Sequence, residues 1–440
     1  MISIESYFEC ITKDSYLKNQ IINNIYLFEF PNKLKELFDF LNKSKAKPII
    51  VGGSVRDKLL GLKNIKDLDV EVYNISSYKK LTEILKQFAR VNFVGESFGV
   101  CKIQIDDIEC DFSLPRVENK ISKGHKGFEV IIDTSIDFKE ASKRRDFTIN
   151  AIGYDVINNT LLDPHKGLFD LKNKLLRYVN KDTFKDDPLR ILRCVGFASR
   201  LEFQIDKELF FTCKKMIKQN LLKELPKERI YQEFVKIFLK SKKPSIAIEI
   251  LKKMEENYLL EQLFTLEKPR YQHTLETLDN LAKTSQKELI FYFLALSLHV
   301  KNQENFLKNF TNEKRMFLGV KKFSIAYQKA LNLLKNGYDD FEVKLLAKEI
   351  EIKKILIFLE ASQPKYLNSL QQLKQKAIEL NVYTKPLKQI INGDDLISLG
   401  FKPSKAFKKI LEDIYIYQLK NSITDKKTLL KIIKENYVKS

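Results

Sequence analysis

The stretch VGGSVRDKLLGLKNIKDLDVEVYN, residues 51–74, joins an apolar strand pattern, two adjacent glycines and an acidic alternation within one short span. The apolar run that ends at Gly52 and Gly53 predicts a short buried strand followed by a turn. Ser54 is placed to cap a helix that runs to Gly61. Glycine lets the backbone approach an anion closely, and the free amides at a helix start attract negative charge. The segment therefore predicts either a phosphate-binding turn or an ordinary tight turn.

Residues 67–73 alternate with period two, which predicts a strand with Leu68, Val70 and Val72 on its apolar face. The other face carries Asp67, Asp69 and Glu71. Residues two apart on a strand are about 6.6 Å apart at the backbone, so Asp67 and Asp69 can converge on hard cations such as Mg²⁺. Glu71 is either a further ligand or an acid that is solvated or paired with arginine.

The pattern continues with a helix over 76–89 and with two strands, 98–105 and 108–114, joined at Asp106 and Asp107. The second strand carries Asp111 on its polar face, so a third carboxylate is available beside Asp67 and Asp69. Strands and helices in this order predict a small α+β domain over a mixed sheet.

The rest of the chain is predicted to be mainly helical. The opening 45 residues favour helices, the charged and glycine-bearing segment 117–128 predicts a mobile loop, and strand signals fade beyond about residue 156. The predicted fold class is α+β, with a mixed-sheet head followed by all-α neck, body and tail. The predicted boundaries are 1–155 for the catalytic head, 156–265 for the neck and 266–440 for the body and tail.

Composition favours a nucleic-acid partner. The 440 residues carry a net charge of +20, and 44% of them are hydrophobic, which is enough for buried cores. No stretch approaches the roughly 20 apolar residues that span a bilayer, so no membrane association is predicted. The five cysteines are odd in number and lack CxxC spacing, which predicts reduced thiols in a cytoplasm. No protein partner is implied.

Several segments together resemble the class II nucleotidyltransferases, the family of bacterial tRNA CCA-adding enzymes and poly(A) polymerases. GGSVRDKLLG followed by DLDVEVY is similar to the family's first signature. The likeness covers most of residues 48–265 in the expected order. Its further segments are GESFGVCKI (95–103), DFSLPR (111–116), KRRDFTINAIGYD (143–155), DPHKGLFDL (163–171), DDPLRILRCVGFASRL (186–201) and PKERIYQEFVKIF (226–238).

The resemblance implies roles for these residues. Asp67 and Asp69 would hold Mg²⁺, and Asp111 would complete the catalytic carboxylates. The residues implied to contact the nucleotide in the head are Gly52, Gly53, Ser54, Arg56, Arg144, Arg145 and Asp146. An aspartate can accept a hydrogen bond from a 2′-hydroxyl, which agrees with a ribose contact at Asp146. Without the resemblance, Arg144 to Asp146 would equally suit an ion cluster at a helix start.

The segment DDPLR resembles the motif that reads the incoming base in place of a template. Asp187 and Arg190 are three apart, which on a helix makes them neighbours on one face. An aspartate accepts from the exocyclic amine of C or A, and an arginine donates to the adjacent ring atom. Arg193, one turn on, would add a phosphate or orienting contact. The alternative is an i, i+3 salt bridge at a helix start. The motif that contains Arg229 and Glu233 is expected to brace the neck.

The C-terminal half resembles a decayed metal-dependent phosphohydrolase domain over residues 273–300. His299 is followed by Val300 where an active domain has aspartate, so we expect no such activity, and His273 and His299 are expected to be satisfied core residues. The tail, 386–419, is similar to the helical end of CCA-adding enzymes, where its lysines would contact tRNA phosphates.

The predicted activity is template-independent addition of C, C and A to the 3′ end of tRNA, from CTP and ATP with Mg²⁺. The alternatives are a poly(A) polymerase, an enzyme that adds only A or only CC, or a non-catalytic RNA-binding protein on the same fold. Three aspartates kept together argue against the last, because a cluster of like charges is costly without a cation.

Overall fold

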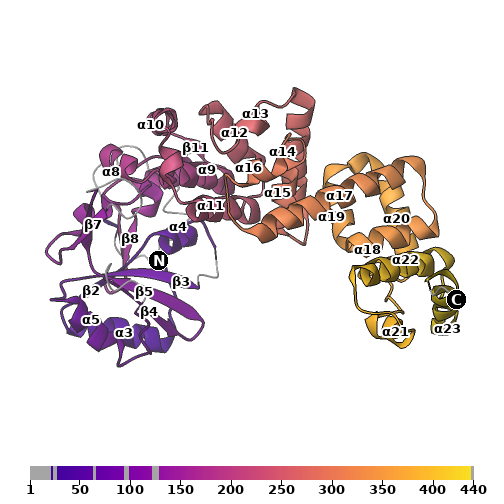
Figure 1. Ribbon diagram of the computed structural model, residues 1–440. Helices are drawn as coiled ribbons and strands as arrows, with labels where there is room; N and C mark the ends of the chain where they lie inside the picture. The colour runs from indigo at the N-terminus through magenta and orange to yellow at the C-terminus, as the bar shows by residue number, and fades with distance from the viewer. Residues whose placement is uncertain (1–20, 23–26, 63–65, 94–98, 121–127, 438–440) are drawn as a thin grey trace. The chain divides into compact units, whose positions relative to one another are not determined.

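The computed structural model describes residues 21–22, 27–62, 66–93, 99–120 and 128–437 (Figure 1). The chain divides into two compact units, one up to Ser241 together with Ile246–Tyr258, the other Lys242–Ser245 together with Leu259 onward. The boundary at Leu259 lies close to the predicted break near residue 266. The predicted break near 155 falls within the first unit, so the division into three domains stays a prediction.

Seven strands of the described residues form one mixed sheet in the order β1-β9-β8-β2-β3-β5-β4. Only β3 and β5 pair in parallel; the other neighbours are antiparallel. The strands of this sheet are β1 (Ile21–Ile22), β2 (Lys47–Val51), β3 (Asp67–Tyr73), β4 (Val100–Ile105), β5 (Ile108–Ser113), β8 (Gly153–Asp155) and β9 (Thr160–Leu162).

Helices cover the sheet and continue beyond it. Leu34, Leu37 and Leu41 on α3 are fully buried, so α3 packs its apolar face beside β2. Figure 1 shows α3 and α5 on the side of the sheet away from α4. The helices up to residue 253 are α3 (Asn32–Lys43), α4 (Gly53–Leu59), α5 (Tyr78–Leu85), α6 (Phe138–Ser142), α7 (Gly167–Lys172), α8 (Lys181–Asp186), α9 (Leu189–Leu201), α10 (Lys207–Lys218), α11 (Lys227–Lys240) and α12 (Ser245–Lys253), with 3-10 turns at Thr148–Asn150 and Leu221–Glu224.

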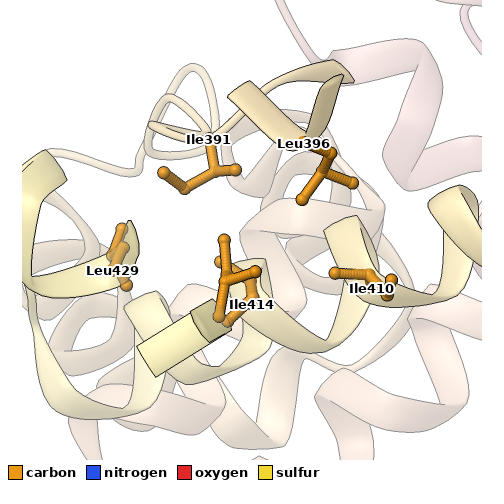
Figure 2. Close-up of a cluster of buried hydrophobic side chains, with 6 residues drawn as sticks. Ile391, Leu396, Ile410, Ile414 and Leu429 are labelled. Carbon is orange, nitrogen blue, oxygen red and sulfur yellow. The ribbon is translucent and has the colours of Figure 1, made fainter. Parts of the chain in front are cut away.

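The second unit is helical within its described residues. In its tail, Ile391, Leu396, Ile410, Ile414 and Leu429 converge on one buried cluster (Figure 2). None of the helices in the described ranges is long and apolar enough to cross a membrane. The helices are α13 (Glu261–Phe264), α14 (Lys268–Lys283), α15 (Leu289–Ser297), α16 (Gln303–Leu307), α17 (Lys314–Asn336), α18 (Asp340–Glu349), α19 (Ile352–Ser362), α20 (Leu367–Glu379), α21 (Gly393–Ser398), α22 (Lys405–Asn421) and α23 (Lys426–Tyr437), with a 3-10 turn at Pro364–Tyr366.

The histidines of the phosphohydrolase-like region contact each other. His273 Nδ1 lies 2.9 Å from His299 Nε2, and His273 Nε2 lies 2.7 Å from the carbonyl oxygen of Ser362. Burial lowers the pKa of His299 to about 4. Both rings are hydrogen-bonded, as predicted, but they are partly buried and do not lie in the core.

Some predicted elements are wrong. The segment predicted as a loop over 117–128 contains β6 (Arg116–Lys120), which pairs antiparallel with β7 (Phe128–Ile132), while residues 121–127 lie outside the described residues. Backbone pairing satisfies the polar groups of this segment despite its charged sequence. Within the opening 45 residues α3 is confirmed, but Ile21–Ile22 is a strand, and residues 1–20 and 23–26 lie outside the described part.

The predicted all-α neck also contains short strands. The neck begins with β9, and β10 (Leu175–Leu176) pairs in parallel with β11 (Gln204–Ile205). Strands of two or three residues are too short to leave an alternation pattern in the sequence.

A buried ion cluster ties β3 to the segment after α6. Arg144 and Arg145 each donate an Nη2 hydrogen bond to Oε1 of Glu71, at 2.6 and 2.7 Å, and the Tyr73 hydroxyl donates to Oε2 at 2.8 Å. Burial alone would raise the pKa of Glu71, but the two arginines lower it to about 2. Of the alternatives left open for Glu71, the arginine-paired acid is confirmed.

Replacing Glu71 should therefore destabilise the fold strongly. In Glu71→Gln the two buried guanidinium groups lose their compensating charge, which should lower the free energy of unfolding by about 3 to 5 kcal/mol. Urea denaturation followed by circular dichroism measures this loss.

Glu109→Gln is the matched control, because Glu109 lies on the adjacent strand in an exposed ion pair with Lys102 at 2.6 Å. Exposed pairs contribute about 1 kcal/mol or less. Equal losses in the two variants would contradict the role given to the Glu71 cluster.

Candidate active site

Four acidic residues lie at the start of the parallel strand pair. Asp69 on β3 lies directly opposite Asp111 on β5, and Asp67 lies opposite Glu109. Lys102 on β4 places its Nζ 3.1 Å from Oδ1 of Asp111. The sheet therefore brings Asp69 and Asp111 together across neighbouring strands, although they are far apart in the sequence.

The electrostatics of Asp69 favour a bound cation. Asp69 keeps an exposed surface, but partial burial of its carboxylate raises its pKa. Arg145 opposes this shift, while the nearby carboxylates of Asp111 and Glu71 add to it. No group of three or more His, Cys, Asp or Glu side chains in the described ranges is arranged to hold a metal by itself. Mg²⁺ usually binds through one or two carboxylates together with substrate phosphates and water, and these residues fit that pattern.

The glycine turn lies against Asp69. Gly52 has φ of 79°, a conformation that side chains rarely adopt, and a Cβ atom there would lie 3.2 Å from both Asp69 Oδ2 and Arg145 Nη1. Glycine is therefore required both for the turn and for the close approach. At Gly53, a Cβ atom would lie 3.5 Å from Arg56 Nη2, so the turn has arginines on both sides.

The predicted cap at Ser54 is wrong. Helix α4 begins at Gly53, its N-cap is Gly52, and no side chain caps it. The Ser54 hydroxyl donates to the carbonyl oxygen of Val51 at 3.3 Å instead. Because no side chain occupies the first amides of α4, they are available to an anion.

Asp146 lies at the centre of a buried hydrogen-bond network. It accepts from the Phe147 amide at 2.8 Å, from Asn150 Nδ2 at 2.9 Å and from Arg193 Nη2 at 2.6 Å. Burial alone would raise the pKa of Asp146, but Arg193 and Asn150 lower it overall. Asp146 is therefore held as a carboxylate, which is the form that accepts hydrogen bonds.

Three arginines lie close to the ring of Phe197. Two of them, Arg56 and Arg193, are predicted site residues, and the third, Arg200, was not predicted from the sequence. The guanidinium carbons of Arg56, Arg193 and Arg200 lie 4.9, 5.5 and 4.4 Å from the ring centroid of Phe197. Arg56 also donates to Asp57 and Asn150. Burial and the charge of Arg56 lower the pKa of Arg200 to about 10. The sequence did contain a signal for this contact, because Phe197 and Arg200 are three residues apart in a predicted helix.

Asp187 and Arg190 do not share a helix. Asp187 lies in extended conformation between α8 and α9, and its Oδ2 accepts from Arg229 Nη2 at 2.9 Å. Arg190 donates to the backbone carbonyls of Thr183 and Arg144. The predicted helical i, i+3 pair is wrong because α9 begins only at Leu189. Base reading by Asp187 and Arg190 stays a prediction.

Arg229 connects α11 to the segment that carries Asp187. This contact agrees with the bracing expected of the motif containing Arg229 and Glu233. Glu233 itself is buried and pairs with Lys236 at 2.7 Å on the same helix. Sequence spacing could not identify Asp187 as the partner, since it lies 42 positions from Arg229.

Known families match two parts of the chain. Residues 49–177 match the family described as Poly A polymerase head domain, and residues 202–269 match the one described as Probable RNA and SrmB-binding site of polymerase A.

Two solved structures share the fold. A CCA-adding enzyme in an apo form has a TM-score of 0.72 at 21% identity, covering 94% of this chain and 99% of that one. The Thermotoga maritima CCA-adding enzyme complexed with tRNA has a TM-score of 0.66 at 20% identity, covering 94% and 98%.

Curated relatives are more similar in sequence. The CCA-adding enzyme of Marinobacter nauticus is 35% identical over 50% of this chain and 57% of its own length, and the Multifunctional CCA protein of Methylobacillus flagellatus is 38% identical over 46% of each. The chain thus spans about half the length of these two relatives. The CCA-adding enzyme of Buchnera aphidicola subsp. Schizaphis graminum is 33% identical over 69% of this chain and 68% of its own length. This chain therefore belongs to the class II nucleotidyltransferase family of CCA-adding enzymes.

Proposed function

We propose that this protein adds C, C and A to the 3′ end of tRNA from CTP and ATP, without a nucleic-acid template, and releases pyrophosphate. The observation that carries the proposal is the pairing of Asp69 with Asp111 beside the Gly52 turn and Arg145. This arrangement combines oxygen ligands for a hard cation with groups that attract a polyphosphate, as nucleotidyl transfer requires.

Asp67 and Asp69 would hold Mg²⁺, with Asp111 completing the carboxylates. When bound, such cations would lower the pKa of the attacking 3′-hydroxyl and would neutralise charge on the departing pyrophosphate. The exposed surfaces of Asp67 and Asp69 support this assignment, because a ligand must remain accessible to the substrate phosphates.

The remaining residues would hold the nucleotide. The amides that open α4, with Arg56, Arg144 and Arg145, would bind its phosphates. Asp146 would accept a hydrogen bond from the ribose 2′-hydroxyl, with Arg193 fixing its orientation. Asp187 and Arg190 would contact the base, and Arg229 would orient Asp187.

Asp69→Asn should reduce nucleotide incorporation by roughly a thousandfold or more, because cation binding contributes several kcal/mol to the transition state. The measurement is primer extension with Mg²⁺ on tRNA transcripts that end before CCA, after C and after CC, each with CTP, ATP or both. RNA binding should be unchanged. Asp107→Asn, in the exposed turn between β4 and β5, is the control.

The wild-type products decide among the alternatives. Addition that stops at CCA supports the proposal, and a long A ladder would identify a poly(A) polymerase. Addition of only C, or of only A after CC, would identify half of a divided system. Tight RNA binding without any incorporation would favour the non-catalytic RNA-binding protein.

Asp187→Ala should reduce the preference for CTP over UTP by about tenfold or more, since a hydrogen-bonded base contact contributes about 1 to 3 kcal/mol of discrimination. The preference is measured as the ratio of kcat/KM values. Asp182→Ala is the matched control, because Asp182 is an exposed acid on α8 in an ion pair with Lys185 at 3.1 Å. An unchanged ratio in Asp187→Ala would exclude Asp187 from base selection.

A further inference from the structure

A groove lies between α8 and α10, within the first unit. Its cavity volume is about 400 Å³, and Lys181 and Lys185 of α8 line it together with Phe211 and Lys215 of α10. This volume lies within the range of pockets that hold small organic ligands.

The two helices present these residues by their spacing. Glu208, Phe211 and Lys215 are spaced i, i+3, i+7, so they lie on one face of α10, while Leu209 and Cys213 are buried on the other. The Tyr178 hydroxyl, just before α8, donates to Glu208 at 2.5 Å and so links the chain before α8 to α10. The groove is therefore a product of packed secondary structure and not of a loop.

Phe211 exposes an unusual amount of aromatic surface. Its exposed fraction is 65%, compared with 48% for Phe93 and 41% for Tyr417. Its contact with Phe210 is edge-on, with centroids 5.9 Å apart and ring planes at 87°. An exposed aromatic ring in a polar setting suits a planar partner that can stack on it.

The charges around this ring are positive and incompletely paired. Lys214 and Lys218, on the neighbouring face of α10, both pair with Glu255. In contrast, Lys181 and Lys215 make no ion pair with any described residue. Lys185 pairs with Asp182 at 3.1 Å, and the Glu208 carboxylate accepts from Tyr178 and keeps its negative charge. The two lysines without an ion pair thus outnumber the single carboxylate that lines the groove, and this balance favours an anion.

We propose that this groove binds an unpaired nucleotide of the RNA substrate, with its base stacked on Phe211 and its phosphate between Lys181 and Lys215. The ring offers a contact that every base can make, and the lysines act as point charges, so binding should depend little on sequence. The identity of the RNA rests on the proposed function. A protein partner is disfavoured because three lysines line the groove and Phe211 is its one exposed aromatic ring.

The groove is separate from the candidate active site. Lys181 and Lys185 are one helical turn apart, whereas Thr183 lies about 200° around α8 and donates from Oγ1 to the backbone oxygen of Lys143. Helix α8 thus faces the segment before Arg144 with one side and the groove with the other. The subsite would hold RNA away from the reacting end.

The test is RNA affinity without nucleotide, measured by fluorescence anisotropy on a tRNA transcript that lacks CCA, over a range of NaCl concentrations. Phe211→Ala should raise Kd about tenfold at fixed salt, and Phe211→Tyr should retain affinity. The association constant K falls as salt rises, and Lys215→Ala should make the slope of log K against log salt less steep by about one. Phe93→Ala and Lys214→Ala, an exposed aromatic and a paired lysine outside the groove, should change little.

Unchanged affinity in both Phe211→Ala and Lys215→Ala would overturn the proposal, as would wild-type protein that does not bind the transcript. A change in the affinity for CTP or ATP alone, with RNA affinity unchanged, would also overturn it, because the groove would then hold free nucleotide. The assay involves no turnover, so a Phe211-dependent affinity supports the groove even if CCA addition is absent. Thermal unfolding of each variant verifies that it is folded.

Discussion

The Glu71 carboxylate, buried beneath two arginines, is the interaction on which the arrangement of the candidate active site depends. One oxygen of this group accepts from both Arg144 and Arg145, so one buried carboxylate pairs with two guanidinium groups that are themselves only slightly exposed. Arg145 is thereby held beside Gly52 and Asp69. The backbone oxygen of Arg144 accepts from Arg190, which extends the same constraint to the start of α9.

This constraint also explains why a strongly basic chain concentrates acids in one strand. Glu71 is needed to neutralise the arginines, whereas Asp67 and Asp69 at the open end of β3 remain exposed. The two kinds of acid share one face of the strand and differ only in depth. Asp69 keeps an exposed surface beside Arg145, whereas Glu71, two residues along β3, is buried against Arg144 and Arg145. The same alternation therefore serves both structure and the proposed binding of a cation.

Sequence patterns predicted what local periodicity controls. The alternation in 67–73 identified β3, and the pattern of 108–114 predicted a strand carrying Asp111, which pairs with β3 opposite Asp69. The patterns failed where distant pairing decides the conformation. β6 and β7 form from a charged segment because each satisfies the backbone of the other, and Asp187 is paired with Arg229 from a helix that begins 40 residues later. Ser54 does not cap the helix because α4 begins one residue earlier, at Gly53, and its N-cap position is Gly52 at positive φ.

The groups proposed to read ribose and base are already engaged by arginines, and this is compatible with substrate binding. A carboxylate offers about four acceptor positions, so Asp146 can accept from a 2′-hydroxyl without losing Arg193. Asp187 accepts from Arg229 mainly through Oδ2, while its Oδ1 accepts from the Leu189 amide at 3.0 Å. Ordering these carboxylates before the nucleotide arrives removes part of the entropic cost of binding. Pairing with Arg193 lowers the pKa of Asp146 despite its burial, so Asp146 acts only as an acceptor. A base that presents an amine to Asp187 would then be favoured over one that presents a carbonyl, and this discrimination would require no movement of the protein.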